Sequence, residues 1–587
     1  MADAAAAPTS EKPSTPSSTE QHDVKPALST SEKAVAHSST SNDTDEPKPH
    51  LHAKTFLAVI AVCLIYMAQL VNLVGAGAQG QVIAGHFGGT ANVVWFSAPV
   101  TIMTVVLGPI VSQAADYWGR KWFLVILTLF GAIGSIVVAR AQTMNQAIGG
   151  FCIIGIAFGT QPLLHVVTSE VLPRRWRGWG QAADMVSNAL GSVLGLYVGG
   201  ALNRTGDPTS DGFRYYYYMC MACFLIAAIM CAIVYNPPEL PTQKQFTNAE
   251  KLAKLDWVGY FLLATGIVLF SVGLSYSKNP YEWSDPHVSA TFAVGITLAL
   301  GLAGYETFFK KDGLFHHGLF TNNRNFAIAT FCVFAEGVAF FAANTYFAFE
   351  VSVLFETDAL LVGVRYSIMM YVSAISACLT GWYCAVTRQA RWATLLAFLI
   401  FIGFFIAMAT TNRDSNTATW GYPVLLGAAL GMTLTTLVTV AQLSTPPELI
   451  SVASGLIISV RSLGGTVGLA IYNALFNDAM GHVGDNIAGA VIPSGLAPDN
   501  VGPFIGALTS HNQTALGMIP GVTPEIIGAG ANALLDTFVV AFRHVWIAGA
   551  AFVGLAAAVS VFLFDPTKEF NMHIDAPVEK EEDLYSA

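Results

Sequence analysis

The stretch Ser-Gln-Ala-Ala-Asp-Tyr-Trp-Gly-Arg-Lys at residues 112–121 is a short polar turn between two long apolar runs. The first run ends near Ala114 and the second begins at Trp122. A turn this short joins two membrane helices on one side of the bilayer. The paired Arg120 and Lys121 favour the cytoplasmic side, because cytoplasmic loops carry an excess of basic residues. This turn therefore sets the orientation of every other predicted span.

The composition is that of a membrane protein. The chain has 587 residues, of which 53% are hydrophobic and only 11% are charged, whereas a soluble domain carries about 25% charged residues. Apolar runs recur along the chain, and each is long enough to cross roughly 30 Å of hydrocarbon as a helix. We therefore predict an all-α polytopic membrane protein whose main partner is the lipid bilayer.

Several functional classes are excluded by the sequence. It has no basic face, so we expect no nucleic acid as a partner. Its eight cysteines lie in or beside apolar runs, without the spacing of a metal site. No nucleophile–base pair or phosphate-binding loop stands out, so we expect neither an enzyme nor a cofactor or metal.

Fourteen predicted spans alternate across the membrane. Alternation places thirteen Lys and Arg residues in the loops on the side of Arg120 and seven on the other side. Five further Lys residues occur in the N-terminal tail, which makes the first side cytoplasmic. The spans are expected near 55–75, 93–114, 121–139, 145–166, 179–201, 215–235, 256–276, 288–308, 325–347, 362–384, 392–411, 420–442, 452–476 and 540–564.

These spans divide the chain into five regions. Residues 1–54 are rich in Ser, Thr and Pro and are expected to form a disordered cytoplasmic tail. Six-helix bundles at 55–235 and 311–564 flank a two-helix linker region at 236–310. Residues 565–587 form a second cytoplasmic tail, since an even number of spans places both termini on one side. Two six-helix halves around a central cavity are typical of transporters that bind substrate near the midplane.

The loop before the last span, residues 477–539, is predicted to be extracellular. It mixes Gly and Pro with short apolar pieces, so we expect one or two short helices on the outer surface. The sequons Asn203-Arg-Thr and Asn512-Gln-Thr both fall in loops assigned to the outside. They predict two glycosylation sites and agree with the orientation.

The turn at 112–121 resembles the signature loop between helices 2 and 3 of the major facilitator superfamily, Gly-x-Leu-Ala-Asp-Arg-x-Gly-Arg-Lys. Asp116, Gly119, Arg120 and Lys121 match it, while Ser112 stands at the first Gly. The resemblance implies a conformational latch, in which a carboxylate and guanidinium groups bond across the cytoplasmic helix ends. The simpler alternative is a loop that only sets topology. The other half of the latch is expected after the fourth span, at Glu170, Arg174 and Arg177.

The fifth span carries Gly191-Ser-Val-Leu-Gly195-Leu-Tyr-Val-Gly199-Gly200. It resembles the antiporter motif of superfamily exporters, Gly-x-x-x-Gly-Pro-x-x-Gly-Gly, with Leu in place of Pro. Small residues four apart let two helix backbones approach closely. The alternative is close packing that says nothing about the direction of transport.

The fourteen spans, the two-helix linker and the long last outer loop resemble the fungal trichothecene efflux pump family, with the allied siderophore transporters and drug:proton antiporters. This resemblance implies a monomeric plasma-membrane exporter of lipophilic secondary metabolites, mycotoxins or drugs, in exchange for protons. A vacuolar or vesicular membrane is the alternative location. A siderophore-iron importer and a transport-inactive sensor or scaffold are the alternative functions. The acid usual in helix 1 is missing upstream of Asn72, and the usual helix 4 Arg falls near Phe151.

Charged residues inside the membrane cost about 2.5–3.5 kcal/mol each and so tend to serve function. Glu336 is a candidate for proton binding, or else a carboxyl held neutral by a hydrogen bond. Arg461 is expected to attract an anionic substrate, to pair with Glu336, or to bond carbonyls. Asp184 and Asn188 lie on the face of the glycine run, and Asp184 is alternatively a latch partner. His165 is expected in a cytoplasmic salt network with Glu170 and Arg174.

Uncharged polar groups complete the predicted cavity. Asn72 lies in the first span, and further amides and aromatic rings lie in several others. A large, mostly apolar cavity with a few polar anchors suits an uncharged or weakly charged organic molecule of several rings. The sequence thus predicts a small organic substrate.

Overall fold

A computed structural model describes residues 49–87, 94–202, 211–239, 241–276, 281, 283–310, 313–321, 323–509 and 513–579. The described residues belong to one compact unit, residues 48–587. The two predicted glycosylation sites, Asn203 and Asn512, lie outside the described residues, as do most of the N-terminal tail and residues 580–587.

Fourteen stretches of helix are long and apolar enough to cross a membrane, as predicted. They are α2 (Ala53–Phe87), α3 (Val94–Trp118), α4 (Arg120–Ala139), α5 (Met144–Phe158) with α6 (Gln161–Glu170), α7 (Arg177–Leu202), α8 (Gly212–Val234), α11 (Trp257–Tyr276), α12 (Pro286–Phe308), α14 (Arg324–Ala342) with the π-helical turn η3 (Ala343–Phe347) and α15 (Ala348–Leu354), α16 (Ala359–Thr387), α17 (Arg391–Ala409), α18 (Tyr422–Leu443), α19 (Ile450–Met480) and α23 (Pro524–Ser560).

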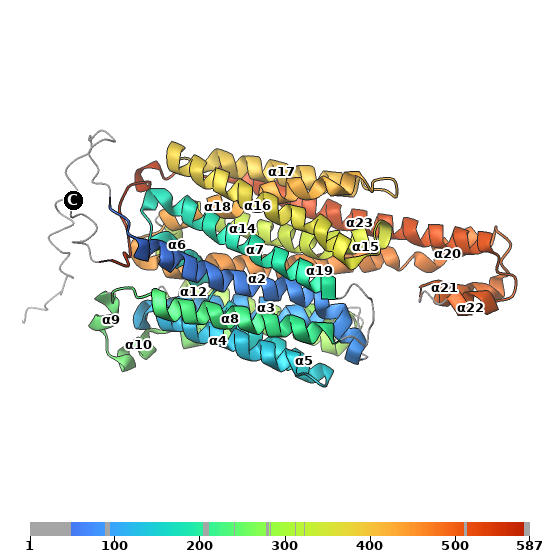
Figure 1. Ribbon diagram of the computed structural model, residues 1–587, viewed down its shortest axis with the longest axis horizontal. Coiled ribbons are helices and arrows are strands. Elements are labelled where there is room, and N and C mark those ends of the chain that lie inside the picture. The colour runs from blue at the N-terminus through green and yellow to red at the C-terminus, as the bar shows by residue number, and fades with distance from the viewer. Residues whose placement is uncertain are drawn as a thin grey trace, which may run out of the picture. The chain divides into compact units, whose positions relative to one another are not determined.

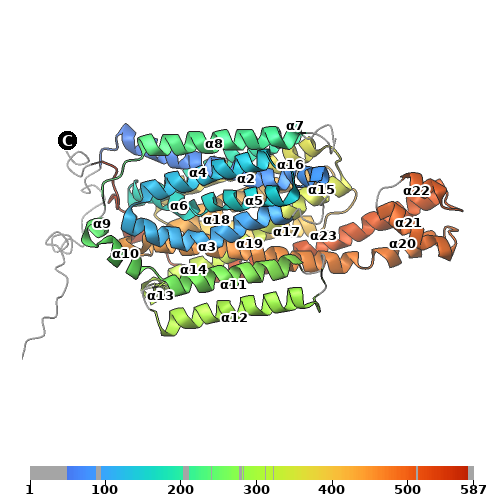
Figure 2. The same ribbon diagram turned by 90° about the horizontal axis from the view of Figure 1, so that it is seen from below.

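The spans form two groups of six with a separate helix pair. Figure 1 shows α2–α8 beside α14–α19 and α23. Figure 2 shows α11 and α12 along one side of these groups. In α12 apolar side chains such as Leu300 (68% exposed) and Phe308 (82%) face outward, as lipid contact requires. The predicted fold class, an all-α chain of fourteen spans arranged six, two and six, is confirmed.

The two halves meet along two helix pairs. In the α7–α16 pair, a Cβ at Gly178 would lie 3.2 Å from the Cα of Gly381. In the α3–α19 pair, a Cβ at Gly108 would lie 2.9 Å from Ser459 Oγ, and one at Gly455 would lie 2.8 Å from Ser112 Oγ. The Ser112 side chain is fully buried in this contact. Packing here is tight, although Ser112 replaces the glycine of the superfamily motif.

The fourth span is broken between α5 and α6. Pro162 enters the chain here, and proline removes a backbone donor from a helix and crowds the preceding turn. Gln69 of α2 binds at this break, since its Nε2 donates to the Ala157 carbonyl at 3.0 Å and to Thr160 Oγ1 at 2.8 Å. The break leaves α6 as a separate helix of ten residues.

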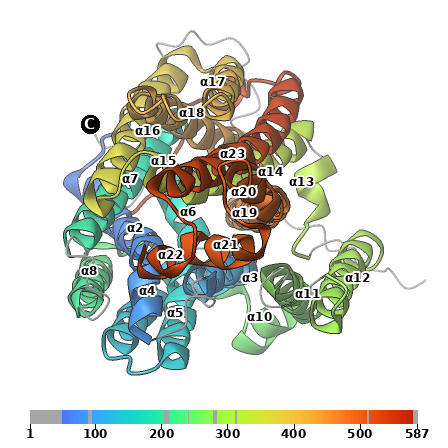
Figure 3. The same cartoon turned by 90° about the vertical axis from the view of Figure 1, so that its right-hand side faces the viewer.

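Short helices lie at both ends of the spans. At one end are α9 (Pro241–Gln245), α10 (Asn248–Lys254) and α13 (His317–Thr321). At the opposite end, α20 (Val483–Val491), α21 (Val501–Thr509) and α22 (Gln513–Met518) project beyond the spans (Figures 1 and 3). The Gln243 side chain of α9 lies 3.3 Å from a Cβ placed at Gly119, so α9 marks the end that carries the turn at 112–121. We call it the latch end.

The segment 477–539 contains more helix than expected. α19 continues to Met480 and α23 begins at Pro524, well before the predicted start near 540. The Thr523 side chain caps α23 by accepting a hydrogen bond from the Ile526 N–H. A small apolar core, which includes Ile487, Phe504 and Ile526, packs these helices together. Residues 524–539 are therefore helical although they precede the span predicted from hydropathy, which begins near residue 540.

Candidate functional site

Glu336 of α14 and Arg461 of α19 form a buried ion pair in the second half. Arg461 donates from Nε to Glu336 Oε2 at 2.6 Å and from Nη2 to Oε1 at 3.0 Å. Glu336 is fully buried and Arg461 is 9% exposed. The guanidinium also lies over the Phe340 ring, 4.8 Å from its centroid. Of the three roles considered for Arg461, pairing with Glu336 is the one that the structure contains.

Glycines bring these two helices together. A Cβ at Gly337 would lie 2.1 Å from the Arg461 carbonyl oxygen, and one at Gly464 would lie 2.2 Å from the Phe334 carbonyl oxygen. Only glycine permits such approach of two backbones. This close approach lets Glu336, which precedes Gly337, accept two direct hydrogen bonds from Arg461 of α19.

His165 of α6 and Asp184 of α7 form a second buried pair, in the first half. The His165 Nδ1 lies 3.0 Å from Asp184 Oδ2 and 2.8 Å from Gln181 Oε1. Thr168 Oγ1 donates to Asp184 Oδ2 at 2.8 Å. His165 is 2% exposed and Asp184 is fully buried.

The expectation that His165 joins Glu170 and Arg174 is wrong, and Asp184 is not a partner of the basic loops. His165 and Thr168 both lie on the face of α6 that meets α7, where Asp184 and Gln181 accept and donate their bonds. Glu170 and Arg174 have other partners, described below. Sequence proximity to Glu170 misled the prediction.

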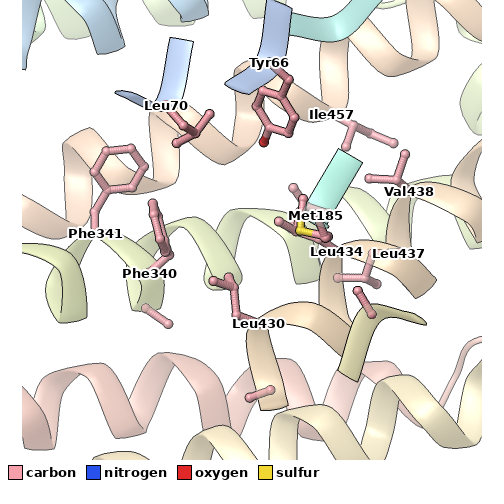
Figure 4. Packing of buried hydrophobic residues seen from close by; sticks show 14 of the residues in the cluster. Tyr66, Leu70, Met185, Phe340, Phe341, Leu430, Leu434, Leu437, Val438 and Ile457 are labelled. Carbon is pink, nitrogen blue, oxygen red and sulfur yellow. The ribbon is translucent and has the colours of Figure 1, made fainter. Parts of the chain in front are cut away.

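An apolar cluster separates the two pairs and contains side chains of both halves. Figure 4 shows Tyr66, Leu70 and Met185 of the first half facing Phe340, Phe341 and several aliphatic residues of the second. The edge of the Tyr66 ring meets the His165 ring at a centroid distance of 5.5 Å. Asn188 Nδ2 donates to the Tyr66 hydroxyl at 3.3 Å. The charges of Arg461 and Glu336 also act on that hydroxyl. Tyr66, which sequence analysis did not select, thus lies between the two pairs.

The predicted latch assembles in part. Arg120 pairs with Glu170, with Nη2 donating to Oε1 at 3.1 Å, and lies 3.4 Å from Asp116 Oδ1. Its Nη2 also donates to Ser451 Oγ of α19 at 2.9 Å, which joins the two halves. Gly119 adopts a φ of +93°, a left-handed conformation that explains the glycine. Lys121 lies apart and bonds the side chain of Asn236.

Arg174 and Arg177 do not join that cluster. Both pair with Asp575, which follows the last span: Arg174 Nη2 donates to Asp575 Oδ1 at 2.7 Å, and Arg177 contacts Oδ2. Arg174 also pairs with Glu569 at 2.7 Å. Burial alone would raise the pKa of the Asp575 carboxyl, but the hydrogen bonds and charges of Arg174 and Arg177 outweigh it and hold that pKa below its usual value. Glu170 is paired with Arg120, whereas Arg174 and Arg177 pair with an acidic residue of the C-terminal segment.

This segment, residues 565–579, is named the C-terminal strap. Backbone hydrogen bonds join it to the first half, with Arg174 N–H donating to the His573 carbonyl at 2.9 Å and Arg175 N–H to the Asn571 carbonyl at 2.8 Å. Asp565 Oδ1 accepts from the Ala390 N–H of the second half at 2.6 Å. Phe570 is fully buried. The strap therefore crosses both halves at the latch end, in a region predicted only to be a tail.

The glycine motif of the fifth span makes close helix contacts. A Cβ at Gly191 would lie 2.4 Å from the Met67 carbonyl oxygen, and one at Gly195 would lie 2.9 Å from the Tyr216 hydroxyl. Gly200 faces Leu360 of α16 at 3.1 Å, and the Gly199 carbonyl accepts from Gln79. These contacts are with α2, α8 and α16, so the motif packs helices of both halves.

Asn72 is also fully buried, beside the Cys220 thiol of α8. Its partner Cys220 belongs to the first half. In the part of the chain that the structure describes, no three His, Cys, Asp or Glu side chains gather as a metal site would require.

Comparison with known proteins agrees with this architecture. Solved transporters share the fold: the proton:xylose symporter XylE has a TM-score of 0.54 at 12% identity, covering 89% of this chain and 98% of that chain. A bacterial homolog of the human lysosomal transporter Spinster has a TM-score of 0.53 at 14% identity, covering 87% and 98%. Both comparisons establish the fold alone.

Sequence relatives identify the family. The trichothecene efflux pump TRI12 of Trichoderma arundinaceum is 21% identical over 86% of this chain and 84% of the relative. The efflux transporter ffsH of Aspergillus flavipes is 24% identical over 77% of each. The family model described as "Fungal trichothecene efflux pump (TRI12)" matches residues 28–578. The chain therefore belongs to the fungal trichothecene efflux pump family, a group of multi-pass membrane transporters of the major facilitator superfamily.

Proposed function

We propose that this transporter exports a lipophilic organic molecule of several rings across the plasma membrane in exchange for protons. The observation that carries the proposal is the apolar cluster between the halves, which has a charged pair on either side. Such a cluster offers a large contact area with few polar anchors. The relatives named as trichothecene efflux pumps support export of a trichothecene or a similar metabolite.

The substrate would bind where Tyr66 faces Phe340 and Phe341. Their rings supply apolar and aromatic contact, and the Tyr66 hydroxyl and the Asn188 amide supply donors for substrate oxygens. Arg461 is held by Glu336 at the edge of this cluster, where its remaining N–H groups could bond a substrate carbonyl. The ion pair thus anchors both the helices and the ligand.

Alternating access follows from the contacts between the halves. At the latch end, Arg120 bonds Ser451, and the Gln442 amide of α18 donates to the His165 carbonyl at 3.1 Å. Release of these bonds would let the halves rock apart at this end, while the opposite ends close over the cluster. The distribution of basic residues supports a cytoplasmic location for this end and for both termini. We further propose that the protein works as a monomer, without an enzymatic step and without nucleic acid.

Export can be tested in a yeast strain that lacks its own drug pumps. The full chain is expressed, and a radiolabelled trichothecene is measured in medium and in cells. Export predicts a higher medium-to-cell ratio and better growth than with an empty vector. Unchanged ratios with protein present at the cell surface would contradict the proposal. Uptake of labelled ferric siderophore would instead identify an importer.

A further inference from the structure

We propose that the coupling proton is carried by the His165–Asp184 pair of the first half, on the imidazole Nε2, and not by Glu336. The inference rests on the proposed proton exchange and names the group that performs it. It is drawn from the geometry of the two buried pairs, which differ in the cation that faces the carboxylate.

The Glu336 carboxylate faces a cation that does not give up its proton. Arginine stays protonated in proteins, and here it donates two hydrogen bonds to the one carboxylate. Protonation of Glu336 would break both bonds and leave the Arg461 charge uncompensated in a buried place. Glu336 is therefore suited to holding Arg461, and with it α19, in place.

The Asp184 carboxylate faces a cation that exists only when it is protonated. Histidine is the side chain whose charge changes between about pH 5 and 8. Binding of one proton by His165 turns a neutral imidazole beside the Asp184 carboxylate into the cation of an ion pair, and release of that proton restores the neutral imidazole. Thr168 Oγ1 and Cys63 Sγ lie 2.8 and 3.9 Å from Asp184 and donate to its carboxylate.

The hydrogen bonds assign the nitrogen that titrates. Gln181 Nε2 donates to the His165 carbonyl at 3.0 Å and to Ser169 Oγ at 2.7 Å, which orients the amide so that its oxygen faces His165 Nδ1. Nδ1 thus faces two acceptors, Gln181 Oε1 and Asp184 Oδ2, and must carry a hydrogen in both states. Nε2 is then the atom that gains and releases the transported proton.

The side chains that face the pair from α2 and α18 carry no formal charge. From α2, the Cys63 thiol and the Tyr66 phenol face it; from α18, the neutral Gln442 amide bonds the His165 backbone. The ion pair of Arg461 on α19 and Glu336 on α14 lies beyond Tyr66 and carries no net charge. The state of His165 therefore decides whether Asp184 is compensated.

The position of His165 links this proton to transport. Its carbonyl accepts the Gln442 bond from the second half, and its ring meets Tyr66 in the apolar cluster. It lies on α6, which the break at residues 159–160 separates from α5. A change in charge at His165 can therefore bias both the contact between the halves and the substrate cluster.

Transport in phosphatidylcholine vesicles tests the inference. The full chain is reconstituted, and a trichothecene is the probe, moved either down its own gradient or by a pH gradient. His165→Gln and Asp184→Asn should retain downhill transport and lose pH-driven accumulation. The wild-type rate should change by up to about tenfold per pH unit somewhere between about pH 5 and 8, and the His165→Gln rate should not. Glu350→Gln is the matched control, because Glu350 is an equally buried carboxylate that accepts from Trp546 Nε1 in the second half.

A second measurement needs no substrate. The purified full chain is taken from about pH 8 to pH 5, and proton uptake is compared between wild type and His165→Gln. One proton more per wild-type chain supports the inference even if the trichothecene is not transported, in which case the proposed function fails and the proton site stands. Equal uptake overturns the inference. So does pH-driven accumulation that survives in His165→Gln and disappears in Glu350→Gln.

Discussion

The two halves of this transporter each bury one acid–base pair, and the pairs differ in the base. Glu336 meets Arg461 across α14 and α19, whereas Asp184 meets His165 across α6 and α7. Each carboxylate is fully buried. An arginine fixes the charge of its partner, while a histidine makes it depend on pH. Although both carboxylates are buried, the Glu336–Arg461 pair acts as a structural anchor and the His165–Asp184 pair acts as a pH-dependent switch.

The packing of the helices around the two pairs differs in the same way, being tighter around the anchor than around the switch. Gly337 and Gly464 hold α14 and α19 at backbone contact, which leaves little room for movement. The other pair lies beyond a helix break and among amide and hydroxyl groups that can exchange bonds. Rigid packing supports the anchor, and adaptable polar packing supports the switch.

The largest effect is expected from breaking the anchor. Arg461→Met leaves Glu336 as a lone buried charge and should destabilise the fold by about 3–5 kcal/mol, with Glu336→Gln similarly costly. The double variant Glu336→Gln/Arg461→Met removes both charges and should recover most of that loss. Thermal unfolding in detergent measures the loss of stability in each variant. A double variant no more stable than Arg461→Met would contradict the anchor.

The strap extends the comparison to a carboxylate outside the spans that is paired with arginines. Asp575→Asn should cost about 1.5–3 kcal/mol, since it removes charge-assisted bonds to Arg174 and Arg177. Hydrogen exchange of residues 565–579 should rise accordingly. Glu569→Gln is the control, because the Glu569 side chain is 45% exposed and its pair should be worth about 0–1 kcal/mol. Equal effects of the two substitutions would show that burial is irrelevant here.

The pairing of Asp575 also predicts how the stability of the strap depends on pH, over a lower pH range than that expected for the His165–Asp184 pair. The pKa of Asp575 is lower in the folded protein than its unfolded value of about 3.9. Its contribution to stability is thus fully present above that unfolded value and is lost as the pH falls through the folded pKa. Strap protection should stay constant between about pH 5 and 8, because this range lies above the unfolded pKa of the carboxyl. Loss of protection within that range would contradict the arginine pairing.

A smaller effect tests the backbone of the anchor. Gly337→Ala places a methyl group against the Arg461 carbonyl and should cost about 1–3 kcal/mol as α14 and α19 separate. Gly301→Ala on α12 is the matched control, because a Cβ there meets nothing within 4 Å. Unfolding temperatures of the two variants should differ clearly. If they coincide, close approach of the backbones does not support the pair.

Local patterns in the sequence predicted much of this fold. Apolar run length gave the fourteen spans, and a charge inside an apolar run selected Glu336, Arg461 and Asp184. Pairing is not local: Glu336 and Arg461 are 125 residues apart, and Arg177 and Asp575 are 398 apart. His165 was misassigned because its sequence neighbour Glu170 was read as its spatial neighbour. The strap was missed because a polar segment after the last span has the composition of a tail.

The division between anchor and switch is tested most directly by a histidine NMR titration of the full chain with ¹⁵N-labelled imidazole rings. The resonance missing from His165→Gln identifies His165. We predict that this resonance moves between about pH 5 and 8 in the wild type and equally in Glu336→Gln/Arg461→Met. A His165 resonance that stays fixed across this range, or that titrates only while Glu336 and Arg461 are present, would contradict the account.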